Sequence, residues 1–376
     1  MANEGPDWQG LLKWSLSHAD GTQPPRNLSD KDRKWFMEAM QGQTIDIIKR
    51  MKEITTVMQI PEEVLESQGV TSSDIEGMLE ELQEHVESID MANDLHTIGG
   101  LVPLIGYLNS SHAGIRAKAA EVVTTIVQNN PKSQQLVMEA NGIEPLFHNF
   151  TSDPDVNART KALGAISSLI RHNKPGISAF RLANGYASLK DALSSDNVRF
   201  QRKALNLLQY LLRENSSDVK VVTELGFTRI FMHLASSEDG DVREAALKGL
   251  LELVKDRTGE SSSSSALGED SEKMKQILEN RIKKISEMNS DDLWAAKEER
   301  QLVDLLWGAC YNEPSSLREK GLLSIPGEDA PPPDVVGKMF EPPLRSHAAR
   351  AEPNSTGVDE KKPPLLLGLG PPNPRS

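Results

Sequence analysis

Residues 159–166 read RTKALGAI, and three other segments of the chain carry the same pattern. These are RAKAAEVV at 116–123, QRKALNLL at 201–208 and REAALKGL at 243–250. The alanines they share, Ala119, Ala162, Ala204 and Ala246, are 43, 42 and 42 residues apart. Within RTKALGAI and the residues after it, apolar side chains recur with the period of a helix, so each segment is expected to open a long amphipathic helix.

A second feature keeps the same spacing. Single glycines precede four short apolar runs, and they are 42, 43 and 41 residues apart: Gly100, Gly142, Gly185 and Gly226. Two independent features with a period of about 42 residues predict armadillo or HEAT repeats. Each unit is expected to contain a glycine turn, a helix, a short polar loop and a longer helix. One unit cannot bury its own apolar face, but stacked units share a continuous core.

The predicted fold class is therefore all-α, an armadillo-like helical-repeat solenoid with flanking capping helices and disordered termini. The boundaries follow from composition: 1–28, a flexible segment with a short amphipathic helix; 29–97, N-terminal helices and cap; 98–257, four repeats; 258–270, a Ser/Gly linker; 271–325, C-terminal helices; 326–376, a disordered Pro-rich tail. In the N-terminal part, Ser73 and Glu76 are expected to form a capping box.

Composition limits the possible partners and compartments. The 376-residue chain has a formal net charge of −13, which disfavours binding to nucleic acid. No apolar stretch is long enough to span a membrane. The residues at the two ends of the sequence lead us to expect neither a secretory signal nor an endoplasmic-reticulum retention tail, and the single cysteine, Cys310, fits a reducing compartment. We expect a monomer in the cytoplasm, with the nucleus as a second compartment.

The sequence contains no recognisable catalytic or cofactor motif. The eight histidines are scattered without HExxH spacing, and the glycines form no phosphate-binding loop. Cys310 lies among apolar residues and is expected to be a buried thiol. We therefore expect no catalytic residues, no metal and no cofactor, and a protein that works through a binding surface.

The repeat register predicts where that surface lies. In armadillo arrays the last helix of each unit lines the concave face, and positions two and six residues after each alanine should point away from the core. These are Glu121, Thr125, Gly164, Ser168, Asn206, Tyr210, Lys248 and Glu252. Armadillo proteins that bind extended basic peptides resemble one another in carrying tryptophan here, and this chain carries none. The small Gly164 and Ser168 favour a folded partner that approaches closely.

A polar stripe with helical spacing lies on the third repeat's long helix: Arg202, Asn206, Gln209 and Arg213. From the residues alone, this stripe is either part of a binding surface or a solvated helix face.

Several segments carry a resemblance to a known family. They include HVESIDMANDL at 85–95, the RTKALGAISSL helix, LLKWSLSHADGT at 11–22 and QLVDLLWGACYNEP at 301–314. The chain resembles the armadillo-type nucleotide exchange factors of heat-shock protein 70 (the Hsp70-binding-protein / Fes-one family), in particular the plant cytosolic form.

The resemblance implies a co-chaperone of protein folding and the heat stress response. Its solenoid would bind the chaperone's nucleotide-binding domain and promote ADP release. In the family, a basic position of the third repeat and a small residue of the IDxA segment lie at this interface, and they match Arg202 and Ala92.

The N-terminal segment of the family competes with clients for the chaperone's peptide-binding domain. The residues that match it are Leu11, Leu12, Trp14 and Leu16. Two alternatives stay open: these residues fold back onto the array, or the protein is a generic armadillo scaffold for another partner.

Overall fold

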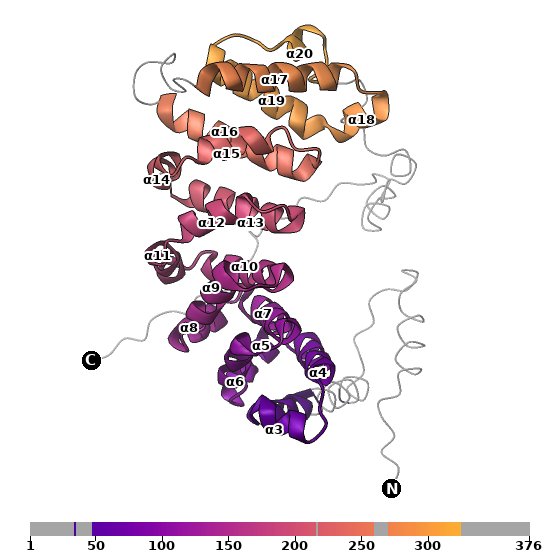
Figure 1. The fold of residues 1–376 in the computed structure, drawn as a ribbon, viewed down its shortest axis with the longest axis vertical. Coiled ribbons are helices and arrows are strands. Elements are labelled where there is room, and N and C mark those ends of the chain that lie inside the picture. Colours follow the sequence, from indigo (N-terminus) through magenta and orange to yellow (C-terminus); the bar gives the residue numbers. More distant parts are fainter. Residues whose placement is uncertain (1–33, 35–46, 216, 259–269, 325–376) are drawn as a thin grey trace, which may run out of the picture. The chain divides into compact units, whose positions relative to one another are not determined.

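The structure is a computed structural model that describes residue 34 and residues 47–215, 217–258 and 270–324. Every regular element in this part is a helix, as predicted, and the helices stack in chain order (Figure 1). By contacts the chain divides after Leu323, and only the first unit, Met1–Leu323, is described below. The predicted segments at 1–28 and 326–376 lie outside the described residues, as does almost all of the predicted linker.

Each repeat contains three helices, one more than the sequence pattern predicts. The first helices are α5 (Ile89–Thr97), α8 (Pro131–Glu139), α11 (Lys174–Leu182) and α14 (Asp218–Glu224). The second are α6 (Leu101–Gly106) with the 3₁₀ turn η1 (Tyr107–Asn109), α9 (Ile143–Ser152), α12 (Gly185–Leu193) and α15 (Phe227–Leu234). The third are α7 (Ala113–Val127), α10 (Val156–Ile170), α13 (Val198–Glu214) and α16 (Gly240–Thr258).

Two of the first helices, α8 and α11, begin at asparagine caps. The side chain of Asn130 accepts a hydrogen bond from the backbone N–H of Ser133, and Asn173 caps α11 in the same way through Gly176. A proline stands in the first turn of both helices, where its missing N–H leaves no hydrogen bond broken. An Asn–Pro stretch after a long helix is thus a helix start here rather than a loop.

The third helices form a single row in which each packs against the next, α7 on α10, α10 on α13 and α13 on α16. Helix α4 (Ser72–His85) precedes α7 in this row, and α19 (Lys297–Tyr311) follows α16. The repeated alanines are fully buried within it: Ala119, Ala162, Ala204 and Ala246. Their small side chains let neighbouring helices approach closely, which explains why the alanine recurs in every unit.

The four glycines of the repeat turns are needed for two different reasons, space for a close neighbour or a left-handed backbone conformation. A Cβ on Gly100, Gly142 or Gly185 would come within 2.5, 2.8 and 2.3 Å of buried side chains, so these turns need glycine for space. Gly226 has open space around it but a φ of +81°, the left-handed conformation that Asn184 adopts one residue before Gly185. Gly226 is therefore equivalent to Asn184, which explains the short spacing of 41 residues.

The cap of α4 differs from the prediction. Thr71 and Asp74 form the capping box, and Ser73 lies inside the first turn. Thr71 has the extended backbone that a cap requires, and its hydroxyl accepts from the N–H of Asp74. On its inner side, α4 buries Ile75, Leu79 and Leu82. Before α4 lie the helical residues 47–58 and α3 (Glu62–Ser67).

The C-terminal helices continue the array. They are α17 (Ser271–Ser286), α18 (Ser290–Ala295), α19 and α20 (Ser316–Glu319), with α19 packed on both α16 and α17. Glu299 of α19, 1% exposed, pairs with Arg243 of α16 at 2.9 Å and with Arg281 of α17 at 2.6 Å. Two arginines from different helices thus converge on one buried carboxylate and join the C-terminal helices to the last repeat.

Candidate partner-binding face

The row α4, α7, α10, α13, α16 and α19 presents one side to the outside, which we call the ladder face. We call the line along which two neighbouring helices of the row meet a seam. At a seam between two third helices, the residue two positions after the repeated alanine of one helix faces the residue directly before the repeated alanine of the next helix. Glu121 accordingly pairs with Lys161 across the α7/α10 seam. At the α16/α19 seam, Lys248 lies 2.6 Å from Glu298. The ladder face is thus built by side chains that join neighbouring helices.

Most residues predicted for the binding surface lie in these seams and are partly buried. Thr125 accepts a hydrogen bond from Gln83 of α4 at 3.1 Å. Gln209 donates to the backbone carbonyl of Ala245 at 2.8 Å. Ser168 is half-buried, whereas Asn206 is exposed. The structure therefore brings these residues onto one row of helices but uses several of them to hold the row together.

Tyr210 is the predicted residue that lies deepest. It is 9% exposed, and its hydroxyl accepts a hydrogen bond of 2.7 Å from the backbone N–H of His172. The Arg171 guanidinium lies over its ring, 4.7 Å from the centroid. Because His172 has a φ of +54°, this contact fixes an unusual turn between α10 and α11. Tyr210 thus supports the turn rather than offering a free side chain.

Arg202 forms a clamp between α13 and the start of α16. Its guanidinium pairs with Asp239 and, at 2.8 Å, with Asp241. The hydrogen bond from Arg202 lowers the pKa of Asp239 below its usual value. The Arg202 side chain is 43% exposed, so a partner can reach it, although it already has two carboxylates.

Gly164 is buried, and the reason lies on the next helix. A Cβ at this position would be 3.2 Å from Nζ of Lys203 and 3.9 Å from its Cε. The sequence suggests that small residues here let a partner come close, but the space beside Gly164 is taken by Lys203. The Lys203 residue is exposed as a whole, but partial desolvation of its ammonium, followed by repulsion from Lys161, lowers the pKa of this group.

Ala92 does not reach the surface. It lies on α5, a first helix, and is 4% exposed. This helix packs against α7 and α8, and Ala92 with Leu95 forms its buried side. Ala92 is therefore a packing residue outside the ladder face. The four N-terminal residues predicted to bind the chaperone, Leu11, Leu12, Trp14 and Leu16, lie outside the described residues.

Sequence reasoning missed a set of loop clamps three residues before each alanine. Three of these residues, Arg116, Gln201 and Arg243, donate to backbone carbonyls of the loop that precedes their helix. The fourth, Arg159, donates to the carbonyl of Phe150 near the end of α9. The repetition of Arg, Arg, Gln and Arg at one register position is the signal that could have revealed them. These residues fix the start of each third helix and hence the register of the ladder face.

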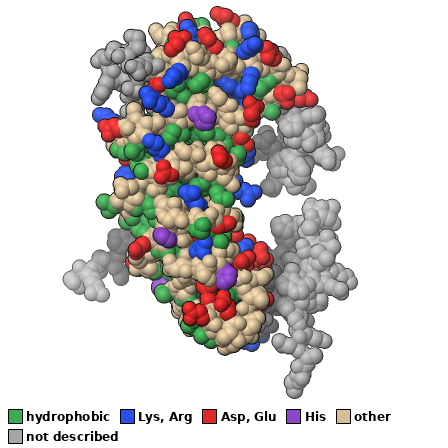
Figure 2. Space-filling model, viewed as in Figure 1, with side chains coloured by type: hydrophobic (Ala, Val, Ile, Leu, Met, Phe, Trp, Pro, Cys, Tyr) green, Lys and Arg blue, Asp and Glu red, His purple; other side chains and the backbone are tan. Residues whose placement is uncertain are grey.

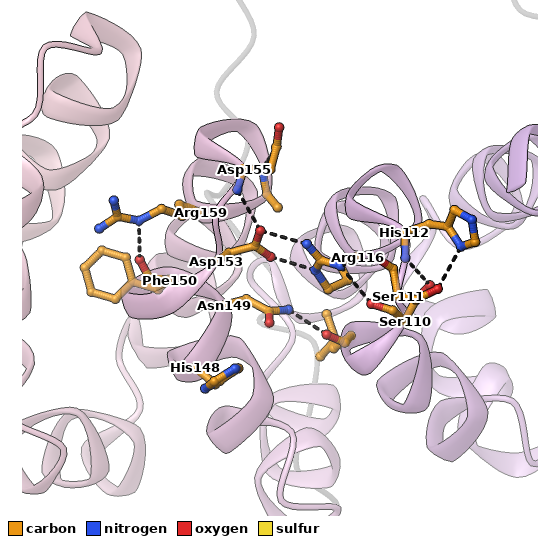
Figure 3. Close-up of polar contacts among 12 residues, drawn as sticks. Ser110, Ser111, His112, Arg116, His148, Asn149, Phe150, Asp153, Asp155 and Arg159 are labelled. Carbon is orange, nitrogen blue, oxygen red and sulfur yellow. Dashed lines mark hydrogen bonds and ion pairs between the residues drawn. The ribbon is translucent and has the colours of Figure 1, made fainter.

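Figure 3 shows the first two of these clamps and the ion pair beside them. Arg116 also pairs with the fully buried Asp153 carboxylate of the next unit, at 2.6 and 2.8 Å. Burial alone would raise the pKa of Asp153, but hydrogen bonds from Arg116 and the N–H of Asp155 lower it. A carboxylate that stays charged thus ties the α9/α10 loop to α7.

A search of the described residues for other chemistry finds little. No group of three or more potential metal ligands comes together within them, and no helix there is long and apolar enough to cross a membrane. Cys310 is partly buried, and burial raises the pKa of its thiol to about 11, so it is a poor nucleophile at neutral pH.

The stacked three-helix units and the ladder face define an armadillo-type repeat protein. A designed armadillo repeat protein, YIII(Dq)4CqI, is similar in fold, with a TM-score of 0.51 and 15% identity over 69% of this chain and 99% of that one. An engineered protein, target OR366, gives a TM-score of 0.53 at 17% identity and covers 70% of this chain and 99% of its own.

Sequence comparison identifies the family. A model of the SIL1/FES1/HPBP1 C-terminal domain matches residues 91–224, and one of the nucleotide exchange factor Fes1 matches residues 8–95. The chain is 31% identical to the Hsp70 nucleotide exchange factor FES1 of Kluyveromyces lactis over 52% of this chain and 67% of that protein. It is 29% identical to Hsp70-binding protein 1 of Homo sapiens over 66% of this chain and 72% of that protein. The chain belongs to this family of Hsp70 nucleotide exchange factors, which are not enzymes.

Proposed function

We propose that this chain is a co-chaperone that binds the nucleotide-binding domain of Hsp70 through the ladder face and promotes ADP release. The observation that carries the proposal is the match of two exchange-factor family models to adjoining parts of the chain, residues 8–95 and 91–224. The second range includes α7, α10 and α13, three consecutive helices of the ladder.

Exchange of this kind requires no bond to be made or broken. The ladder face holds one lobe of the nucleotide-binding domain, and the body of the repeat array blocks the position that the other lobe takes when the cleft is closed. The open chaperone is then bound more tightly than the ADP-closed one, so its population shifts toward opening. ATP can afterwards rebind and release the factor.

The side chains of the ladder face support a folded partner over an extended peptide. Its seams are filled by pairs such as Glu121–Lys161 and Lys248–Glu298, which leave no row of free asparagine or tryptophan side chains for a peptide backbone. On the face drawn in Figure 2, acidic side chains gather at both ends of the described array, and Lys and Arg side chains lie among them at the end formed by α17–α20. Such patches orient a charged partner before contact.

The remaining parts of the proposal rest on the sequence alone. Residues 11–16 would contact the peptide-binding domain of Hsp70 and help clients leave. We place the protein in the cytoplasm, and also the nucleus, as a monomer of the plant cytosolic type. The alternative is an armadillo scaffold for a different protein partner.

Thermodynamic linkage gives a direct test of the mechanism. If the chain favours the open state, it lowers the affinity of Hsp70 for ADP, and ADP must lower the affinity of Hsp70 for the chain by the same factor. Calorimetric titration of the full chain into nucleotide-free and ADP-saturated Hsp70 should show weaker binding with ADP by about tenfold or more. Equal affinities in the two titrations would favour the scaffold reading.

A further inference from the structure

The ladder face contains three lysines at one register position, directly before the alanine of three consecutive third helices. They are Lys118 on α7, Lys161 on α10 and Lys203 on α13. The ammonium groups of Lys118 and Lys161 each pair with a carboxylate from the preceding helix of the row. Lys118 lies 3.5 Å from Glu80 of α4, and Lys161 pairs with Glu121 of α7.

Lys203 lacks this carboxylate. The residue that meets it from α10 is Gly164, which occupies the register position of Glu121 and has no side chain. Within the part of the chain that the structure describes, no hydrogen bond or ion pair involves the Lys203 ammonium. Its nearest charged neighbours include Lys161 and Arg199, which disfavour its charge, and Glu121, which favours it but already holds Lys118 and Lys161.

The Lys203 residue is exposed on the ladder face, so a carboxylate of a partner can reach its ammonium, and an ammonium without a counterion beside other cations is less stable than one that has a counterion. Where a partner supplies the missing charge, the complementary contact favours that partner over others and fixes the register of the complex. The glycine lets the ammonium lie close to α10, 3.2 Å from where a Cβ on Gly164 would stand, in place of a glutamate side chain.

We propose that Lys203 is the receptor for a carboxylate of the bound chaperone lobe, which takes the place at the α10/α13 seam that Glu121 takes for Lys161. This inference rests on the proposed function, because the partner is the folded nucleotide-binding domain of Hsp70. It assigns the contact to Lys203 rather than to its neighbour Arg202, whose guanidinium is already shared between Asp239 and Asp241.

The test compares variants of the full chain in calorimetric titration against purified nucleotide-free Hsp70. Lys203→Gln should weaken binding by about tenfold, whereas Lys203→Arg, which keeps the charge, should stay within about threefold of wild type. Lys220→Gln is the matched control: it removes the same charge from an exposed site on α14 and should leave affinity unchanged. Thermal unfolding checks that all variants fold like wild type.

A second pair of variants, at Gly164, tests whether a carboxylate of this chain can replace that of the partner beside Lys203. Gly164→Glu recreates the arrangement of Glu121 and Lys161 and should weaken Hsp70 binding more than Gly164→Gln, which has the same shape without the charge. Wild-type affinity of Lys203→Gln, or equal affinities of the two Gly164 variants, would overturn the inference even though the wild-type chain binds. Failure of the wild-type chain to bind Hsp70 at all would instead contradict the proposed function.

Discussion

Buried ion pairs at single positions tie one repeat to the next. Asp153 and Arg116 form such a pair, with side chains 0% and 12% exposed. The folded-state pKa of Asp153 is lower than its ordinary value, so the unfolded chain binds a proton more readily than the folded one. The stabilisation is therefore complete above the unfolded pKa of about 3.9 and is lost as the pH falls through the folded pKa.

Replacement of this carboxylate should remove the pH-dependent contribution. Asp153→Asn leaves Arg116 without a charged partner and should lower the free energy of unfolding at pH 7 by about 3 kcal/mol. The difference from wild type should shrink as the pH falls below about 4, because the carboxyl of the unfolded wild-type chain then takes up a proton, and it is lost fully only below the folded-state pKa. Urea unfolding from pH 7 to pH 3 measures it, with the exposed Asp196→Asn as control. A difference that stays constant over this range would contradict the account.

The exposure of single side chains is the property that the sequence predicted least well. The identity of Gly164 is visible in the sequence, but the reason for it is Lys203 on the next helix, about one repeat away. Ala92 and Tyr210, which the sequence predicts for the binding surface, likewise have buried side chains. Exposure depends on how neighbouring repeats pack, and a single helix's periodicity does not contain that information.

At the scale of the helix and its turn, the repeated alanines and the repeated glycines have different physical causes. The alanines recur because helices cross closely there, and three of the glycines recur because a side chain would overlap a buried neighbour. These steric requirements leave a strict signal, so the third helices and the turns could be predicted. The first helices are only seven to nine residues long. The signal of α8 and α11, an asparagine cap followed by proline, also fits a loop, and α5 and α14 begin without it.

Two glycines provide a matched test of this distinction. A Cβ on Gly185 would lie 2.3 Å from the ring of Phe180, which is fully buried and cannot move aside, whereas a Cβ on Gly77 of α4 would meet nothing within 4 Å. Gly185→Ala should therefore lower the free energy of unfolding by about 2 kcal/mol. Gly77→Ala should raise it by up to about 1 kcal/mol, because alanine favours the helix.

Denaturant unfolding measures both changes in the free energy of unfolding, which should be negative for Gly185→Ala and positive for Gly77→Ala. Stabilisation by Gly185→Ala would show that the turn has room that the structure does not contain.

At the scale of the folded array, the C-terminal helices belong to the repeats rather than to a separate domain. The buried Glu299 accepts from arginines of α16 and α17, and α19 extends the row of third helices. The ladder face therefore runs without a break from α4 to α19, over helices that include both family-matched and unmatched residues. A surface of this extent can contact a whole lobe of a folded partner.

The central claim is that binding along this face opens the nucleotide cleft of Hsp70. The most direct measurement is the rate at which fluorescently labelled ADP leaves Hsp70 in stopped flow, with excess unlabelled nucleotide and increasing concentrations of the full chain. The rate should rise with concentration and reach a plateau at least tenfold above the spontaneous rate, if the open state is favoured by about 1.4 kcal/mol or more. An ADP release rate that stays at the spontaneous value when the chain is saturating would contradict the account.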